Sequence, residues 1–279
     1  MVSNVKRCIL VTCGTSILSN VSRYASKCEK LKDIEEKYKI SSWARAEPKS
    51  KEDEEAGRHA FESSPVFLGL YECLKQDPKG MSAELNTLIN YETQKLHYRV
   101  TEVYLYYTDT GAGTLCSNLV AKYIREEMKM SVQQVRVEGY GINFEEGISN
   151  LVGKIVQITK SKRESGYIVD LLATAGYKPE VTAATIGAMI SGASAVYYIH
   201  ESFKDIVKIP LVPVSIRDDV RRIIEEVSPF ESEEKARQKY GDAVVDALLE
   251  SGILKEKDGR LEVNRWVKKL LSPKSSQVA

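Results

Sequence analysis

The sequence lacks an excess of charge of either sign, since 40 lysines and arginines stand against 39 aspartates and glutamates in 279 residues. Generic polyanion binders draw their affinity from a large basic surplus, so this balance argues against a general nucleic-acid binder. The composition, 43% hydrophobic and 28% charged, is that of an ordinary globular protein. Its length suits one large domain with a small one attached.

Cysteines are few and lack the spacing of a zinc site or a disulfide framework. They form no CxxC motif, have no histidine partner, and are odd in number: Cys8, Cys13, Cys28, Cys73 and Cys116. This pattern predicts reduced thiols in an intracellular protein and no metal centre.

Long apolar runs are also missing. The N-terminal run turns polar at Cys13-Gly14-Thr15, which is too short for the hydrophobic part of a signal peptide. The longest uncharged stretch, residues 181–199, reaches membrane-spanning length but is broken by two glycines and two serines. We interpret it as a buried helix followed by a buried strand. The sequence thus predicts a cytoplasmic protein with no membrane segment.

Strand-like and helix-like segments alternate along most of the chain. Such alternation implies parallel strands joined by right-handed crossovers. We therefore predict an α/β fold with a Rossmann-like, doubly wound, mostly parallel sheet. Apolar, β-rich segments predict strands at 8–12, 103–108, 135–140, 167–173, 195–199 and 206–214, and amphipathic segments predict helices at 114–128, 144–162 and 180–191.

Two regions depart from this alternation. Residues 41–65 are crowded with charges and show no period, so we expect a mobile surface insertion there. After residue 215 the pattern predicts a winged-helix-like module, and we place the domains at 1–215 and 216–279. Its expected elements are helices at 219–227, 233–240 and 242–251, a hairpin at Asp258-Gly259, and a last helix from Asn264.

Three polar loops follow predicted strands, at the edge where open α/β sheets bind ligands. In the first, the hydroxyls of Thr12, Thr15 and Ser16 stand beside Gly14 and suit phosphate oxygens. Serine and threonine at such positions also cap helices, which is the alternative interpretation. No Walker A lysine follows, so this loop is not an ATPase P-loop.

The second loop, residues 108–114, contains Asp109, Thr110, Gly111 and Gly113 between a strand and a helix. Its glycines fall one residue short of the GxGxxG motif, and the acid that a nicotinamide cofactor needs after the next strand is misplaced. Glycines that merely permit a tight turn and close helix packing explain the pattern about as well as ligand contact does.

The third loop, residues 174–178, ends in Gly176-Tyr177-Lys178 just before a helix that begins with Pro179. A lysine at a helix N-terminus opposes the positive end of the helix dipole, which suggests an anion bound beside it. The alternative is that Lys178 projects into solvent. Together with the other two loops, we favour phosphate binding.

These three motifs in this order resemble the CRISPR-associated Rossmann fold family, CARF, over about residues 5–215. With the winged-helix-like tail, the layout resembles the stand-alone archaeal ring nucleases. The resemblance implies a homodimer that binds cyclic tetra-adenylate across its two-fold axis. It also implies cleavage to linear di-adenylate with 2′,3′-cyclic phosphate ends, which switches off type III CRISPR signalling.

The resemblance further implies that a ribose 2′-hydroxyl attacks the adjacent phosphate, with no metal or other cofactor. Ser16 and Lys178 match the residues that carry this chemistry. Tyr177 and the residues before it depart from richer motifs, which leaves the ring size open. The ligand contacts it implies are Thr12, Gly14, Thr15, Asp109, Thr110, Gly111, Gly113, Gly176 and Tyr177.

Two other functions compete with this one. A fused ribonuclease of the Arg-x4-6-His type is nearly excluded, because none of the three histidines fits that motif. A non-cleaving cyclic oligoadenylate sensor that regulates transcription through the tail is the runner-up. Residues 217–279 carry thirteen basic and thirteen acidic side chains, and the expected recognition helix is acidic, so DNA binding by the tail is disfavoured.

Overall fold

The computed structural model describes residues 6–94, 99–174, 178–199, 206–211, 214–227 and 231–271. A six-stranded sheet with the order β3-β2-β1-β4-β5-β6 lies at its centre. The strands are parallel except β6, which pairs antiparallel with β5. The predicted α/β fold with a Rossmann-like, mostly parallel sheet is confirmed. The strands are β1 (Arg7–Cys13), β2 (Val100–Thr108), β3 (Ser131–Val137), β4 (Ile168–Leu172), β5 (Ala195–Ile199) and β6 (Ile206–Pro210).

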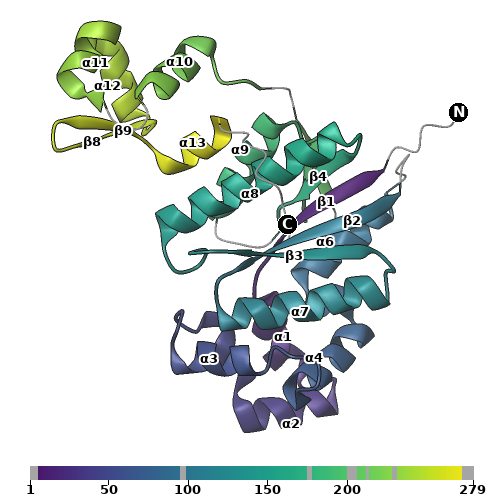
Figure 1. Cartoon of the computed structure of the whole chain (residues 1–279). Helices are drawn as coiled ribbons and strands as arrows, with labels where there is room; N and C mark the ends of the chain where they lie inside the picture. Colours follow the sequence, from purple (N-terminus) through teal and green to yellow (C-terminus); the bar gives the residue numbers. More distant parts are fainter. Residues whose placement is uncertain are drawn as a thin grey trace, which may run out of the picture.

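Helices cover both faces of the sheet (Figure 1). Successive side chains of a strand point to opposite faces, and β1 is buried along its whole length. Ile9 and Val11 therefore enter one core, while Cys8 and Leu10 enter the other. The first core is built with α1 (Ser16–Tyr24), α6 (Ala83–Glu92) and α7 (Gly111–Glu126), and the second with α8 (Phe144–Glu164) and α9 (Lys178–Ser191).

The connection from β1 to β2 is long and helical, and the prediction of a mobile insertion at 41–65 is wrong. Trp43 and Ala56 are buried in the first core. Ser50 caps the helix that follows it by accepting a hydrogen bond from the Asp53 amide. Apart from the buried Asp53, most charged side chains of this segment are exposed, and they outnumber the inward-facing positions. The connection also contains α2 (Glu29–Tyr38), η1 (Ile40–Arg45), α3 (Lys51–Arg58), α4 (Pro65–Gln76) and α5 (Pro78–Met81).

Two of the five cysteines are joined, so the prediction of reduced thiols throughout is wrong. Cys28, which precedes α2, forms a disulfide with Cys73 of α4, 45 residues further along. The packing of α2 against α4 brings the two together, and no sequence motif marks such a pair. Cys8, Cys13 and Cys116 are free and buried.

The tail follows its predicted elements closely. Its three-stranded sheet has the order β7-β9-β8, and Asp258 and Gly259 form the hairpin turn with positive φ angles of 54° and 71°. The tail has a core of its own, and its last helix also packs Leu270 against Val152 and Val156 of α8. The domain boundary itself stays a prediction. The elements are α10 (Asp218–Val227), β7 (Glu231–Ser232), α11 (Glu233–Tyr240), α12 (Asp242–Glu250), β8 (Leu254–Lys257), β9 (Arg260–Val263) and α13 (Arg265–Leu271).

Several boundaries differ from prediction, and at the end of β3 the cause is a pair of glycines that bend the chain. The strand expected at 135–140 is β3, which begins at Ser131 and ends at Val137, because Gly139 and Gly141 adopt positive φ just beyond it. Within the described ranges, no helix combines the length and the apolar character that crossing a membrane requires.

Candidate functional site

Strand β1 lies at the point where the order of the strands in the sheet reverses. On one side of β1 lie β2 and then β3, and on the other side lie β4 and then β5. β1 and β4 are direct neighbours, with Val11 paired to Leu172. Open α/β sheets bind ligands beyond the carboxyl ends of the strands at such a switch point. The first and third predicted loops follow these two strands, so the topology brings them side by side.

The third loop is described only at its two ends. Thr174 follows β4, and α9 begins at Lys178. Gly176 and Tyr177 lie outside the described residues, as does the side chain of Lys178. The N-terminus of α9 nevertheless starts where this loop ends, so Lys178 belongs to the switch point by its place in the chain. The roles predicted for Gly176, Tyr177 and Lys178 stay predictions.

A buried carboxylate, Glu84, holds the first loop. Its Oε1 accepts a hydrogen bond from the Gly14 amide at 2.8 Å, and its Oε2 accepts one from the Ser16 hydroxyl at 2.7 Å. Glu84 is only 1% exposed, whereas Gly14 and Ser16 are half-buried. Two donors of the loop that the sequence assigned to phosphate are thus held by the protein's own anion.

The first turn of α6 completes this arrangement. Ser82 caps α6 by accepting from the Leu85 amide at 3.2 Å, and its own hydroxyl donates to Glu84 Oε2 at 2.7 Å. The Ala83 amide donates to Ser16 Oγ at 3.1 Å. Ser16 therefore donates to one residue of α6 and accepts from another, which fixes its hydroxyl in place.

The other two hydroxyls of the first loop are used differently. Thr15 stands at the N-cap of α1, but its side chain makes no capping bond and donates instead to the Ala44 carbonyl of η1 at 3.1 Å. Thr12 is 1% exposed. The loop is thus bound to η1 through Thr15 and to α6 through Gly14 and Ser16, and the capping interpretation does not apply to Thr15.

Helix α6 contacts the third loop as well. The hydroxyls of Thr87 and Thr174 lie 2.6 Å apart, and Thr87 also donates to the Ala83 carbonyl at 2.8 Å. One helix therefore touches the ends of both β1 and β4. A single rigid element thus supports both halves of the switch point.

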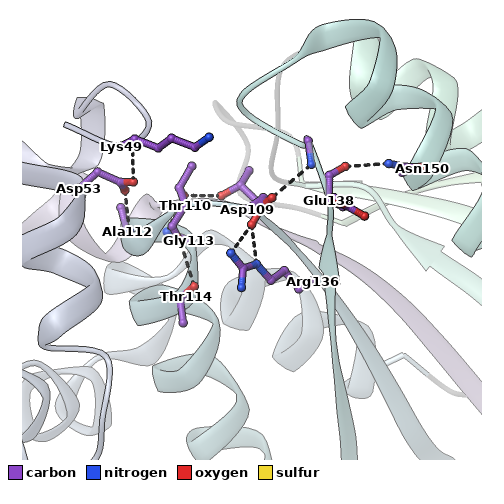
Figure 2. A network of polar contacts seen from close by, with 12 residues as sticks. Lys49, Asp53, Asp109, Thr110, Ala112, Gly113, Thr114, Arg136, Glu138 and Asn150 are labelled. Atoms are coloured by element: carbon purple, nitrogen blue, oxygen red, sulfur yellow. Dashed lines mark hydrogen bonds and ion pairs between the residues drawn. The ribbon is translucent and has the colours of Figure 1, made fainter. Parts of the chain in front are cut away.

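The polar groups of the second loop are bound by other parts of the protein, as the network of polar contacts in Figure 2 shows. Asp109 pairs with the Arg136 guanidinium and accepts from the Gly139 amide at 3.3 Å. Thr110 caps α7 by accepting from the Gly113 amide at 3.0 Å. The Ala112 amide donates to Asp53 Oδ1 at 3.0 Å, and Asp53 is 5% exposed.

The two glycines of the second loop permit close contacts. A Cβ atom on Gly111 would lie 1.9 Å from the Asp53 carbonyl oxygen, and one on Gly113 would lie 2.1 Å from Thr108 Oγ1. Real Cβ atoms essentially never come so close to another heavy atom. The approach of α3 explains Gly111, and the approach of Thr108 at the end of β2 explains Gly113. Ligand contact by Asp109, Thr110, Gly111 and Gly113 stays a prediction.

Two buried side chains beside the start of α9 were not anticipated. Tyr140, which follows β3, is 1% exposed, and Glu180 in the first turn of α9 is 7% exposed. Burial raises the pKa of the Tyr140 hydroxyl well above its usual range, and the neighbouring Glu180 carboxylate, which accepts its hydrogen bond, raises it further. This bond ties the β3–α8 turn to the N-terminus that carries Lys178.

A cavity of about 540 Å³ lies between α8, α9 and α13. Pro179, directly after Lys178, contributes to its wall together with Phe144 and Trp266. Phe144 is 61% exposed, so the cavity opens on an apolar rim. A volume of this size is in the usual range for small-molecule sites. The tail therefore contributes to a cavity beside the predicted site.

Sequence reasoning missed Glu84 because the residue has no motif of its own. It lies 68 residues from Ser16, in a helix that the alternation of strands and helices does not predict. The only local signal is Ser82, whose spacing before an apolar run is typical of a helix N-cap.

Residues 79–212 match the model of a family described as CRISPR-associated protein (Cas_APE2256). The match covers just under half of the chain and supports a CRISPR-associated family. It includes Glu84, the second and third loops and Lys178, and it ends before the tail.

Proposed function

We propose that this protein is a ring nuclease of a CRISPR system, a phosphodiesterase that binds cyclic tetra-adenylate and opens it to linear di-adenylate. One observation carries the proposal. Ser16 and the start of α9 at Lys178 follow adjacent strands at the switch point of the sheet, where this fold binds ligands. The family match supports the CRISPR context, and the resemblance to CARF proteins supplies the ligand.

The proposed chemistry needs only positioning and charge. A ribose 2′-oxygen attacks the adjacent phosphorus, the bond to the 5′-oxygen breaks, and a 2′,3′-cyclic phosphate forms. The hydroxyl proton leaves to solvent and the 5′-oxygen takes a proton from solvent, so no cofactor is consumed. Ser16 holds the ribose, and the Lys178 ammonium stabilises the negative charge that develops on the phosphoryl oxygens.

Two copies of the site complete the proposal. Cyclic tetra-adenylate presents equivalent phosphates on opposite sides of the ring. A homodimer with its two-fold axis through the ring centre offers each of two phosphates the same Ser16 and Lys178 pair. Two cuts then release two di-adenylate molecules, which ends the signal.

The cavity at the start of α9 favours a second candidate, a sensor that binds the ring without cleaving it. Asn264 and Trp266 of the tail line this cavity together with Pro179. A ligand at Lys178 is therefore one residue away from a surface that the tail shares. In this function the tail passes the binding event on to a partner. DNA is the less favoured partner, because the tail carries as many acidic as basic side chains.

The test is to incubate the purified protein with radiolabelled cyclic tetra-adenylate in EDTA and to separate the products by chromatography. A ring nuclease yields di-adenylate with 2′,3′-cyclic phosphate ends. Tight binding without product identifies the sensor instead. A protein that neither binds nor cleaves the ring would contradict both candidates.

A further inference from the structure

Among the residues that the structure describes, the Ser16 hydroxyl has two hydrogen-bonding partners, which leaves one of its positions open. A serine hydroxyl carries one donor hydrogen and two acceptor lone pairs. Its hydrogen is given to Glu84 Oε2 at 2.7 Å, and one lone pair accepts from the Ala83 amide at 3.1 Å. With these two described partners, one lone pair remains on Ser16, a half-buried residue just beyond β1.

The surroundings of Glu84 hold it as an acceptor. The Gly14 amide can only donate to Oε1. Ser82 accepts from the Leu85 amide as the N-cap of α6, and its hydrogen goes to Oε2. Glu84 also lies in the first turn of α6, where the helix dipole favours negative charge. Three donors and a positive helix end thus surround the Glu84 carboxyl group.

We propose that Glu84 fixes the polarity of Ser16, so that Ser16 accepts a hydrogen bond from a ribose 2′-hydroxyl and does not donate one to a phosphate. This inference rests on the proposed function and deepens it. Phosphate oxygens in a diester only accept, so they cannot pair with the remaining lone pair. A 2′-hydroxyl donates, and it distinguishes ribose from deoxyribose.

This polarity divides the work at the switch point. Ser16 orients the 2′-oxygen and draws its hydrogen away from the phosphorus, which leaves the oxygen's lone pairs directed for attack. The phosphate is left to Lys178 and the N-terminus of α9. Glu84 is then a positioning residue that acts through Ser16 and makes the site select rings of ribonucleotides.

A substitution of almost the same shape reverses the polarity. In Glu84→Gln the amide oxygen still accepts from Gly14, but the amide nitrogen donates to Ser16 Oγ. The Ser16 hydrogen is then free to donate to the ligand. Glu146→Gln, at an exposed carboxylate in the first turn of α8, is the matched control.

The experiment compares the binding of two rings in the cold, before turnover. One is cyclic tetra-adenylate, and the other carries fluorine in place of each 2′-hydroxyl, which accepts weakly but cannot donate. We expect the wild type and Glu146→Gln to prefer the hydroxyl ring by about tenfold. We expect Glu84→Gln to lose or reverse this preference while its thermal unfolding stays cooperative.

The outcomes separate this inference from the proposed function. If the wild type binds both rings equally, or if Glu84→Gln keeps the wild-type preference, the polarity assignment is overturned while ring binding stands. If the wild type binds neither ring, the proposed function itself fails. Should Glu84→Gln not fold, Ser16→Ala decides: the preference must vanish there, and its persistence overturns the inference.

Discussion

The loops after β1 and β2 look alike in sequence, yet the structure uses them differently. Both are short and polar and contain glycine, both precede a helix, and in both a buried carboxylate accepts from a backbone amide. At β2 the carboxylate comes from α3, whose backbone lies against Gly111. At β1 the carboxylate comes from α6, and Ser16 keeps an acceptor position.

The difference shows what separates a packing junction from a candidate site. In the loop after β2, Thr110 caps the helix, Asp109 pairs with Arg136, and the glycines lie against other atoms of the protein. In the loop after β1, one side of Ser16 is fixed and the other remains available. A polar loop at a strand end therefore predicts a ligand site only once the partners of its groups are known.

The disulfide gives the largest expected effect on stability. It joins the start of α2 to α4. Both helices belong to the β1–β2 connection, whose helix α3 contacts the second loop. Disulfides commonly contribute about 2–4 kcal/mol, more for longer loops. We expect Cys28→Ser to lose about 3 kcal/mol in chemical denaturation, and the wild type to lose a similar amount on reduction. An unchanged denaturation midpoint after reduction would show that the disulfide does not stabilise this connection.

Gly111→Ala tests the packing junction directly. The new Cβ would meet backbone atoms of α3 that have no room to move, so we expect a loss of about 2–3 kcal/mol in urea denaturation. Gly187→Ala is the matched control, because its Cβ would meet Val152 at an ordinary 3.4 Å in the middle of α9. The control should be neutral or slightly stabilising. A Gly111→Ala protein as stable as the control would contradict the close approach.

Asp53→Ala removes the carboxylate of the same junction. The amides of Ala112 and Lys49 would both lose their acceptor, and we expect a loss of about 2 kcal/mol. Asp53→Asn keeps one carbonyl oxygen and should recover part of this loss. Equal unfolding free energies for the two variants would show that the hydrogen bonds contribute little.

Much of the fold could be predicted because its signals are local. The buried strands, the helices α7 to α9, and the Asp258-Gly259 hairpin each show a period or a turn residue within a few positions. The helices between β1 and β2 could not be predicted in this way. In α3, for example, the buried residues are Asp53 and Ala56, and one of them is charged.

The candidate site was predictable only in part, for a related physical reason. Ser16 and Lys178 follow strands that the sequence identifies, and the sheet order makes those strands neighbours. Glu84 could not be found, because its partners lie about seventy residues away and hydrogen bonds across such distances leave no spacing pattern. The bond between Cys28 and Cys73 was missed for the same reason.

The central claim is that the switch point at β1 and β4 carries the chemistry. The most direct test measures single-turnover cleavage of cyclic tetra-adenylate by Ser16→Ala and Lys178→Ala, with Ser19→Ala as the control serine on the exposed side of α1. We expect a rate loss of about 10²–10³ for Lys178→Ala, a smaller but clear loss for Ser16→Ala, and none for Ser19→Ala. Wild-type rates in both Ser16→Ala and Lys178→Ala, with stability unchanged, would contradict it.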